Sequence, residues 1–320
     1  MSFWTELLGF LRPAIKEKGQ KEGVNASDVA AQQPPGTAKV AVTSDASHES
    51  VEVLQLEIFL QTDPGSVRTN NEDRCFYKRP GDPTLAASKG TLVIVADGMG
   101  GAAGGEVASE MAIRTIPDLY YNSTKAPALA VKESLETASS EIYRAAQADP
   151  ELRGMGTTCV AVAILIPQVF VAYVGDSRLY LLREGGFYQI TEDHTIVGDM
   201  VRKGILTREQ ARTHEERNVL SLSLGGRPEI QASYLEEPMT LLPGDRLLLC
   251  SDGLHDLISD LEMQSIVAAS PVQDAVQGLI NAANREGGHD NITAALIHAY
   301  IGKPSERDCR ATRELSISSA

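Results

Sequence analysis

Four aspartates share a position that could support chemistry, because each stands at the edge of an apolar run typical of a β-strand: Asp97, Asp176, Asp252 and Asp290. A further acidic pair, Glu72-Asp73, ends the polar stretch 62–73. Carboxylates that are brought together at the rim of a sheet repel one another unless cations separate them. Their oxygens suit hard divalent ions such as Mg²⁺ and Mn²⁺. The pattern therefore favours a metal site built from acids that are distant in the chain.

Each of these acids also has an ordinary explanation when it is taken singly. An Asp-Gly pair after a strand, as at Asp97 and Asp252, is typical of a turn. Asp176 and Asp290 have the residue type of a capping residue. The recurrence of acids at such positions is what favours metal binding over a set of separate turns.

Apolar runs predict the elements that would position these acids. Residues 54–60 alternate as a strand does, and further strands are predicted over 92–96, 159–166, 169–174, 247–250 and 292–298, with a hairpin of 179–183 and 187–190. Helical spacing predicts helices over 106–120, 127–148 and 271–285. Hairpin-type connections favour an α+β fold of mainly antiparallel sheets covered by helices over a doubly wound parallel sheet.

Composition divides the chain into four parts. Residues 1–18 carry apolar side chains at helical spacing and predict an amphipathic segment. Residues 19–50 contain no Leu, Ile, Phe, Trp or Tyr and predict a disordered linker. A folded domain is expected over 51–301, with a polar excursion over 194–235, and a disordered tail over 302–320.

Charge and cysteine usage exclude several classes of protein. The chain has 43 Asp and Glu against 29 Lys and Arg, a net charge of −14, which argues against a nucleic-acid binder. No apolar run approaches the roughly 20 residues that span a bilayer. The 4 cysteines are scattered without C-x-x-C spacing, which predicts reduced thiols in a cytoplasmic protein.

Several motifs together resemble the metal-dependent protein phosphatases of type 2C, the PPM family, in their bacterial form. In order, they are the stretch 62–73, Val95-Ala96-Asp97-Gly98-Met99-Gly100-Gly101, Gly154-Met155-Gly156-Thr157-Thr158, Val174-Gly175-Asp176-Ser177-Arg178, Ser251-Asp252-Gly253-Leu254 and Asp290-Asn291-Ile292-Thr293. The resemblance covers about residues 53–301. It implies a four-layer α-β-β-α sandwich, with two mainly antiparallel sheets flanked by helices and a small flap subdomain at about 194–235.

The resemblance also implies ligands for two Mn²⁺ or Mg²⁺ ions. By matching position, Asp97 would bridge both ions and Gly98 would offer its carbonyl oxygen. Asp252 and Asp290 would complete the shell of the first ion. Glu72 and Asp73 would hold the second ion, largely through waters. Such a pair of ions lowers the pKa of a shared water, so no protein nucleophile is required for attack on phosphorus.

Two further residues receive roles from the resemblance. Asp176, with Asp252, matches the ligand pair of a third, weaker ion, although a turn-capping role for Asp176 stays open. Arg68 would grip the phosphate oxygens through two parallel hydrogen bonds and offset the charge of the transition state. Arg68 and Asp97 are therefore the predicted catalytic residues.

One position departs from the family. Members commonly carry a His, a proposed general acid, where this chain has Ala102. Loss of general-acid help can cost about 10² to 10⁴ in rate. His289 is the nearest candidate in sequence for a replacement, but an outer or exposed position is expected for it.

Three functions are compatible with this pattern. The favoured one is a serine/threonine protein phosphatase acting on phosphorylated proteins, opposed by a serine/threonine kinase. The alternatives are a pseudophosphatase that binds phosphoproteins with weak turnover because of Ala102, and a phosphatase dedicated to one regulatory partner. Residues 1–18 either pack on their own domain or dock to a partner or membrane surface, which would make the cytoplasmic protein peripherally membrane-associated.

Overall fold

A computed structural model describes residues 52–100 and 104–303. The predicted amphipathic segment 1–18, the linker 19–50 and nearly all of the tail 302–320 lie outside the described residues. No helix within the described ranges combines the length and the apolar character needed to cross a bilayer.

The first sheet has 5 strands in the order β1-β12-β11-β7-β8, and its pairs are antiparallel. The strands are β1 (Val53–Asp63), β7 (Arg178–Arg183), β8 (Gly186–Gln189), β11 (Arg246–Cys250) and β12 (Ile292–Gly302). The first and last strands of the domain therefore lie side by side, with Asp63 paired to Ile292 at one end of the ladder. This pairing brings the loop after β1 close to the residues that precede β12.

The second sheet has 7 strands, with β10-β6-β5-β3-β2 as its path, β4 paired to β3 and β9 paired to β6. Its strands are β2 (Asp73–Lys78), β3 (Thr91–Met99), β4 (Gly156–Thr157), β5 (Cys159–Leu165), β6 (Gln168–Val174), β9 (Ser233–Tyr234) and β10 (Met239–Thr240). All of these pairs are antiparallel as well.

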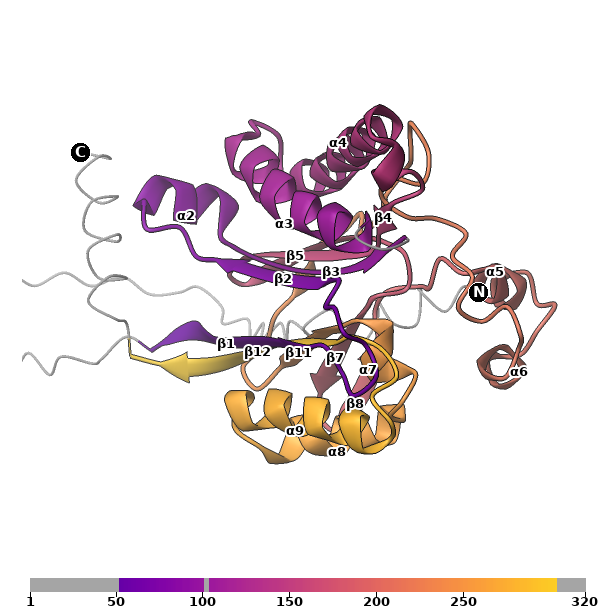
Figure 1. Cartoon of the computed structure of the whole chain (residues 1–320). Helices are drawn as coiled ribbons and strands as arrows, with labels where there is room; N and C mark the ends of the chain where they lie inside the picture. Colours follow the sequence, from indigo (N-terminus) through magenta and orange to yellow (C-terminus); the bar gives the residue numbers. More distant parts are fainter. Residues whose placement is uncertain (1–51, 101–103, 304–320) are drawn as a thin grey trace, which may run out of the picture.

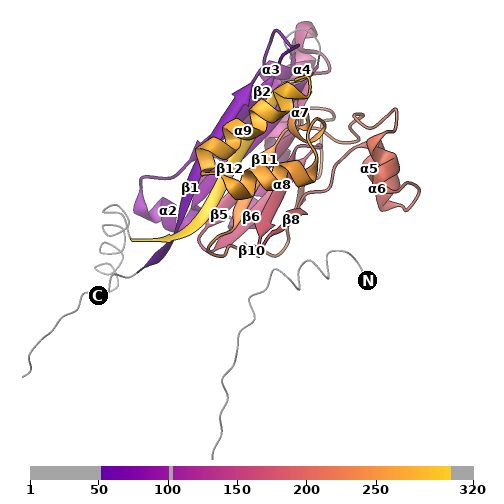
Figure 2. The same ribbon diagram turned by 90° about the horizontal axis from the view of Figure 1, so that it is seen from below.

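Helices cover the outer face of each sheet, which gives four layers (Figure 1). On the second sheet lie α2 (Pro83–Lys89), α3 (Gly104–Asn122) and α4 (Pro127–Ala148), followed by the 3₁₀ turn η1 (Pro150–Leu152). The first sheet is covered by α8 (Asp260–Ala269) and α9 (Val272–Arg285), as the view from below shows (Figure 2). The short helix α7 (Asp252–His255) directly follows β11.

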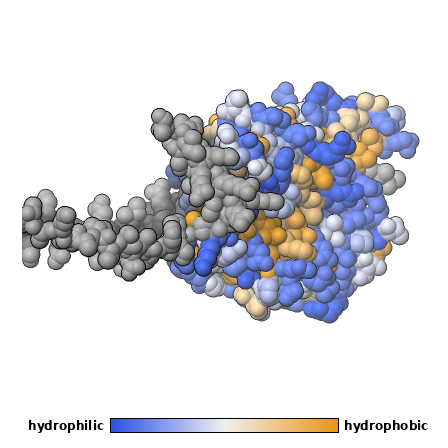
Figure 3. Space-filling view, turned by 90° about the vertical axis from the view of Figure 1, so that its left-hand side faces the viewer, coloured by the Kyte–Doolittle hydropathy of each residue, from blue (hydrophilic) through white to orange (hydrophobic). Residues whose placement is uncertain are grey.

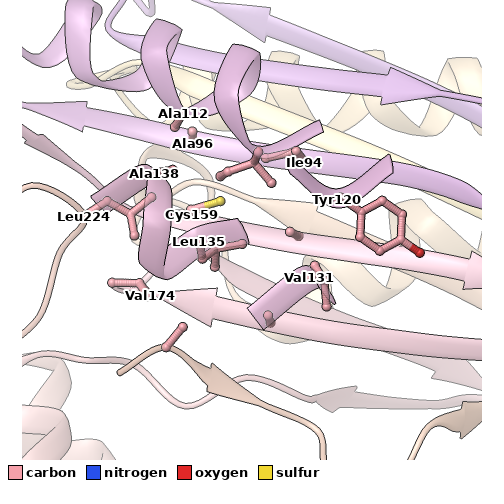
Figure 4. Packing of buried hydrophobic residues seen from close by; sticks show 14 of the residues in the cluster. Ile94, Ala96, Ala112, Tyr120, Val131, Leu135, Ala138, Cys159, Val174 and Leu224 are labelled. Carbon is pink, nitrogen blue, oxygen red and sulfur yellow. The ribbon is translucent and has the colours of Figure 1, made fainter. Parts of the chain in front are cut away.

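Three apolar clusters fill the spaces between the four layers. The cluster between α3, α4 and the second sheet includes Ile94, Leu135 and Cys159, which point toward one another in Figure 4. A second cluster joins the two sheets, and a third lies under α8 and α9. Because the central strands β3, β5, β6 and β11 are buried on both faces, they read as nearly continuous apolar runs, and their polar residues lie at or near their ends. The rims of the sheets are thus the places where chemistry can be held rigidly.

The excursion predicted at 194–235, called the flap below, contains α5 (Ile196–Arg202) and α6 (Arg208–Arg212), which project from one end of the sandwich (Figures 1 and 2). Each helix starts at a threonine cap, and Thr207 with Gln210 forms a complete capping box. The opposite end of the sandwich, away from α5 and α6, shows an apolar patch within a mainly hydrophilic surface (Figure 3).

The predicted fold class is confirmed: the described residues form two antiparallel sheets flanked by helices. The predicted helix 127–148 has the observed bounds of α4, and 271–285 differs from α9 only by Pro271, which is its N-cap. Sequence periodicity missed β2, α2 and α8. In β2 and α8 the alternation is weak because partly exposed side chains occupy both faces; Leu261 of α8, for example, is 77% exposed.

Candidate functional site

The predicted acids lie at the end of the sandwich from which the flap projects. The pairing of β2 with β3 places Asp73 opposite Asp97. In the other sheet, Asp252 is the first residue of α7, directly after β11. Ser251 connects the two sheets, because its Oγ donates a hydrogen bond of 2.7 Å to Oδ2 of Asp73. Residues separated by up to 179 positions in sequence therefore meet across the sandwich.

Three carboxyl groups form a chain of contacts at this point. The side chains of Asp73 and Asp252 both lie within hydrogen-bonding reach of the Asp97 carboxyl, whose single proton can be donated to one of them at a time. Burial is the main reason that the pKa of Asp97 lies well above its ordinary value, and the charges of Asp73 and Asp252 raise it further. Burial likewise raises the pKa of Asp73 to about 7. Carboxyl groups in such contact can be held together by shared protons or by cations.

Among the described residues, no Lys or Arg lies in an ion pair with the carboxyl groups of Asp73, Asp97 or Asp252. Asp73 is fully buried, and its Oδ1 has no hydrogen-bond partner among the described residues. Buried charge without a counter-charge is costly, and hard divalent cations prefer this type of oxygen ligand. The donor set therefore fits such cations.

The contacts among these acids are pairwise. In the part of the chain that the structure describes, no group of three or more Asp, Glu, His and Cys side chains is arranged to hold an ion as it stands. Replacing the protons shared along the carboxyl chain by a cation would require these side chains to turn toward a common point.

Glu72 lies beside this chain of acids, where two glycines allow a close approach of the backbone. Its carbonyl oxygen accepts hydrogen bonds from the Gly98 N–H at 3.2 Å and from the Ser109 hydroxyl at 2.5 Å. A Cβ at Gly98 would collide with the Gly105 carbonyl, and a Cβ at Gly105 would collide with the Glu72 carboxylate. Burial raises the pKa of Glu72, while the charge of Arg68 opposes that shift. Glycine is thus required at both positions.

Arg68 and Asp290 form an ion pair at the mouth of the site. Nη2 of Arg68 donates to Oδ2 of Asp290 at 2.8 Å, and the two side chains are 56% and 42% exposed. The loop that carries Arg68 packs on this region, since a Cβ at Gly65 would collide with the Asp290 carbonyl. An ion pair this exposed contributes little to stability. The guanidinium is therefore free to exchange Asp290 for another anion at low cost.

Asp176 occupies the turn between β6 and β7 and is buried. Burial raises its pKa well above the ordinary value, and the charge of Asp252 adds to that shift. Its backbone carbonyl accepts a hydrogen bond of 3.0 Å from Nε2 of His255, which lies on the same short helix as Asp252. The structure thus brings Asp176 near enough to Asp252 for their charges to interact.

A cleft of about 710 Å³ lies between the flap and the sandwich, next to Asp176. Its walls include Val197 and Arg202 from the flap and His255 and Asp256 from the sandwich. Whatever enters this cleft contacts the flap and the Asp176 turn together.

Asn291 is a site residue whose contacts sequence reasoning did not predict. Its Oδ1 accepts from the Glu72 N–H at 2.8 Å, and its Nδ2 donates to the carbonyls of Asn70 at 2.8 Å and Pro64 at 3.0 Å. Its own N–H donates to Oδ1 of Asp290 at 2.9 Å. One amide therefore fixes the acidic loop against the start of β12. Its place directly after Asp290 was the only signal for it.

Arg74 is a second such residue. Its guanidinium donates to the carbonyls of Asn71 and Asp73 at 2.7 and 2.8 Å, and to the carboxylates of Glu106 and Glu110 at 2.8 and 3.2 Å. These bonds tie the loop that carries Glu72 and Asp73 to α3. No local pattern marks Arg74, because its carboxylate partners lie 32 and 36 residues away.

Comparisons with known proteins agree with this architecture. The family described as "Protein phosphatase 2C" matches residues 66–297. Protein phosphatase PhpP of Streptococcus pneumoniae is 38% identical over 249 residues, which are 76% of this chain and 97% of that protein. The serine/threonine phosphatase of S. agalactiae has a similar structure, with a TM-score of 0.69 and 34% identity over 76% of this chain and 99% of its own. The catalytic domain of serine/threonine protein phosphatase PstP, solved with 2 manganese ions, gives a TM-score of 0.67 and 33% identity over 78% and 100%.

This chain belongs to the protein phosphatase 2C family. The family resemblance expected from the motifs is confirmed, and the relatives are named as phosphatases, which favours the enzyme over a phosphoprotein-binding protein. Ala102 lies outside the described residues. His289 is exposed, as expected.

Proposed function

We propose that this chain is a metal-dependent protein serine/threonine phosphatase that hydrolyses phosphoserine and phosphothreonine in proteins. The observation that carries the proposal is the cluster of carboxyl groups Asp73, Asp97 and Asp252, none of which forms an ion pair with a Lys or Arg of the described residues. The names of its relatives support the substrate class.

In this proposal Mn²⁺ or Mg²⁺ ions occupy the carboxyl cluster. Asp97 would be shared between two ions, with the Gly98 carbonyl and the carboxylates of Asp252 and Asp290 on the first. Glu72 and Asp73 would serve the second, and Asp176 with Asp252 a third. When bound, such ions supply the positive charge that lowers the pKa of a water molecule and polarises the phosphoryl group. The PstP domain solved with 2 manganese ions supports this choice of metal.

Arg68 would bind the phosphate at the mouth of the site. A phosphate oxygen would replace Asp290 as the partner of its guanidinium, which can form two parallel charge-assisted hydrogen bonds. The exchange would release the Asp290 carboxylate at the moment when the substrate arrives. Arg68 thereby orients the phosphoryl group and offsets the charge that spreads over its oxygens in the transition state.

The leaving group is where the departure of this chain from the family motif, at Ala102, would matter. Without an imidazole at Ala102, departure of a serine or threonine alkoxide receives no proton from that position. A phenolate needs none. We therefore expect the ratio of aryl-ester to phosphothreonine hydrolysis to be high, and an Ala102→His variant to lower that ratio.

The test measures phosphate release from a phosphothreonine peptide and from p-nitrophenyl phosphate, with Mn²⁺ and after chelation. Release of phosphate from both substrates only with Mn²⁺ is expected, and the Asp97→Asn variant is the matched inactive control. Calorimetric proof of Mn²⁺ binding without release from either substrate would overturn the proposal.

Three finer points remain predictions. They are an opposing serine/threonine kinase, a cytoplasmic location, and docking of residues 1–18 to a partner or membrane surface. Deletion of residues 1–50 should leave peptide hydrolysis intact while altering location or partner capture; unchanged location and capture would contradict docking.

A further inference from the structure

His194 lies where three segments meet, and the proposed function gives it no role. It is only 8% exposed, and its ring stacks on Tyr173 of β6 with centroids 5.2 Å apart. It is the first residue of the flap, whose last strand, β9, also pairs with β6. The beginning and the end of the flap therefore converge on this side chain.

The imidazole of His194 is bonded at both nitrogens. Gly175 donates its backbone N–H to Nδ1 at 3.0 Å, so Nδ1 is unprotonated and the hydrogen lies on Nε2. Nε2 then donates to the Ser233 hydroxyl of β9 at 3.0 Å. Burial lowers the pKa of His194, which keeps this neutral form. One ring thus joins the exit of the flap to Gly175, the residue before Asp176.

The backbone around His194 strengthens the same connection. The His194 N–H donates to the Gly175 carbonyl at 3.0 Å, and its own carbonyl accepts from the Ser221 N–H at 2.8 Å. The neighbouring residue, Asp193, accepts from the Arg178 guanidinium at 2.9 and 2.6 Å. Two consecutive residues at the base of the flap therefore hold the turn that carries Asp176: His194 bonds Gly175 before it, and Asp193 bonds Arg178 after it.

The turn that carries Asp176 is held by the sandwich as well as by the flap. The Ser177 hydroxyl lies 2.7 Å from the Thr158 hydroxyl, and His255 donates to the Asp176 carbonyl. Among the described residues the Asp176 carboxylate itself accepts no hydrogen bond, so its position is set by the turn, which the base of the flap holds at Gly175 and Arg178. A shift of the flap that breaks the bond between Gly175 and His194 would remove one of the contacts that hold the turn, and the Asp176 carboxylate would then be less well positioned.

We propose that His194 is a positioning residue that couples the flap to Asp176, so that order in the flap and cation binding at Asp176 strengthen each other. The proposal rests on the proposed function, which makes Asp176 a cation ligand. Linkage requires the coupling to be reciprocal: a cation at Asp176 orders the flap by the same factor by which an ordered flap favours the cation. Since flap and Asp176 line one cleft, a peptide bound there would act on both.

The test uses the full chain, freed of metal and titrated with Mn²⁺ in a calorimeter, together with amide hydrogen exchange over residues 196–220. Asp176→Asn identifies the weak class of Mn²⁺ sites by removing it. His194→Phe keeps the ring and its stacking on Tyr173 but loses both hydrogen bonds. Ser233→Ala removes the bond between His194 and the flap exit but leaves the bond between His194 and Gly175, and Ser134→Ala, which removes a buried hydroxyl from α4, is its matched control.

We expect His194→Phe to weaken the Asp176-dependent class of Mn²⁺ sites by at least about fivefold, the lower end of typical allosteric coupling. The remaining Mn²⁺ sites should change less than about twofold, which a general loss of stability would not produce. Mn²⁺ should slow exchange over 196–220 in the natural chain but not in Asp176→Asn. Ser233→Ala should show a smaller effect in the same direction, and Ser134→Ala none.

The coupling is overturned if His194→Phe binds the weak class of Mn²⁺ as the natural chain does, if Mn²⁺ leaves exchange in the natural flap unchanged, or if Asp176→Asn keeps that class. Should His194→Phe fail to fold, Ser233→Ala and the Mn²⁺ effect on exchange still decide the matter. Binding and exchange need no turnover, so failure of the phosphatase assay would be recognised separately.

Discussion

Two buried aspartates lie at opposite ends of strand β11, and in the described structure only one of them is paired with an arginine. Asp245, 2% exposed, precedes β11, and its carboxylate accepts from Nε and Nη2 of Arg183 at 2.9 and 2.6 Å. Asp73, 0% exposed, meets the other end through Ser251, and its Oδ1 has no partner in the described ranges. Burial alone therefore does not mark a functional acid. The absence of an internal counter-charge does.

The same contrast holds for the two arginine pairs at these ends. The side chains of Arg183 and Asp245 are 7% and 2% exposed, whereas those of Arg68 and Asp290 are 56% and 42% exposed. A buried pair is expensive to break, and an exposed pair costs little. The chain thus fixes its structural arginine and leaves its proposed phosphate-binding arginine able to change partners.

Among the substitutions that test this comparison, Asp97→Asn should have the largest effect on activity, and it should leave stability unchanged. With saturating Mn²⁺, kcat for p-nitrophenyl phosphate should fall by at least about 10³, because several kcal/mol of charge stabilisation are lost. The melting temperature of the metal-free protein should not fall, since burial already favours the neutral form of Asp97 and the neutral amide of Asn can still donate to Asp73 and Asp252. Activity above a tenth of the natural value would contradict this assignment.

Arg68→Ala should give the next largest effect. We expect kcat/KM for the phosphothreonine peptide to fall by about 10- to 100-fold, which corresponds to roughly 1.4–2.7 kcal/mol of lost transition-state binding. Thermal stability should be unchanged. Arg68→Lys, which keeps the charge but loses the planar fork, should recover only part of the activity. Full recovery in Lys would show that charge alone is needed.

Asp245→Asn should do the opposite, lowering stability while leaving activity intact. It leaves the buried Arg183 without its carboxylate, at an expected cost of about 3–5 kcal/mol and roughly 10 °C in melting temperature. The activity of the folded protein should persist. Thermal unfolding followed by circular dichroism measures the loss, and the double variant Arg183→Met/Asp245→Leu should restore much of it. A stable but inactive Asp245→Asn variant would contradict the assignment of a structural role to Asp245 and a functional role to the acids at the other end of β11.

Much of the fold could be predicted because its central strands are buried on both faces. The continuous run 92–96 and the run 159–166 mark β3 and β5 without any structural knowledge. The strand β2 has only one buried residue, Asp73, so it lacks an apolar pattern. Its register against β3 is nonetheless what places Asp73 opposite Asp97.

The site was less predictable than the fold. Its acids are visible because each stands beside an apolar run, but their meeting point depends on contacts between distant segments. Asn291 bonds the Glu72 backbone across 219 residues, and the ring of His194 bonds Ser233 across 39. Neither partner can be inferred from local spacing. The family resemblance predicted that these acids meet at one site; the periodicity of the sequence did not.

The pH dependence of the metal-free protein offers a smaller test of the same contrast. Since burial raises the pKa of Asp73 from 3.8 to about 7, the folded chain binds this proton more tightly than the unfolded chain. The stability that results is complete below about pH 4 and is lost as pH rises toward 7. Between pH 5 and 7.5 we expect the natural chain to lose at least about 3 °C in melting temperature relative to Asp73→Asn, or about 1 kcal/mol.

Mn²⁺ should abolish this difference in the natural chain, because a cation replaces the proton as the partner of the carboxylates. Asp73→Asn is the matched control, since it keeps every other titrating group. Parallel pH profiles for the two metal-free proteins would mean that Asp73 is ionised in the folded state without cost, which would remove the physical basis of the comparison.

His289→Ala should have the smallest effect. The side chain is exposed and lies next to Asp290, in the loop before β12, where it is the nearest imidazole in sequence to the proposed ligands. An exposed residue that bonds none of the described acids should change kcat by less than about twofold, and stability by less than about 0.5 kcal/mol. Asp290→Ala, the neighbouring control, should lose activity strongly. A loss of the same size in His289→Ala, confined to phosphothreonine and absent with p-nitrophenyl phosphate, would instead make His289 the acid that replaces the histidine missing at Ala102.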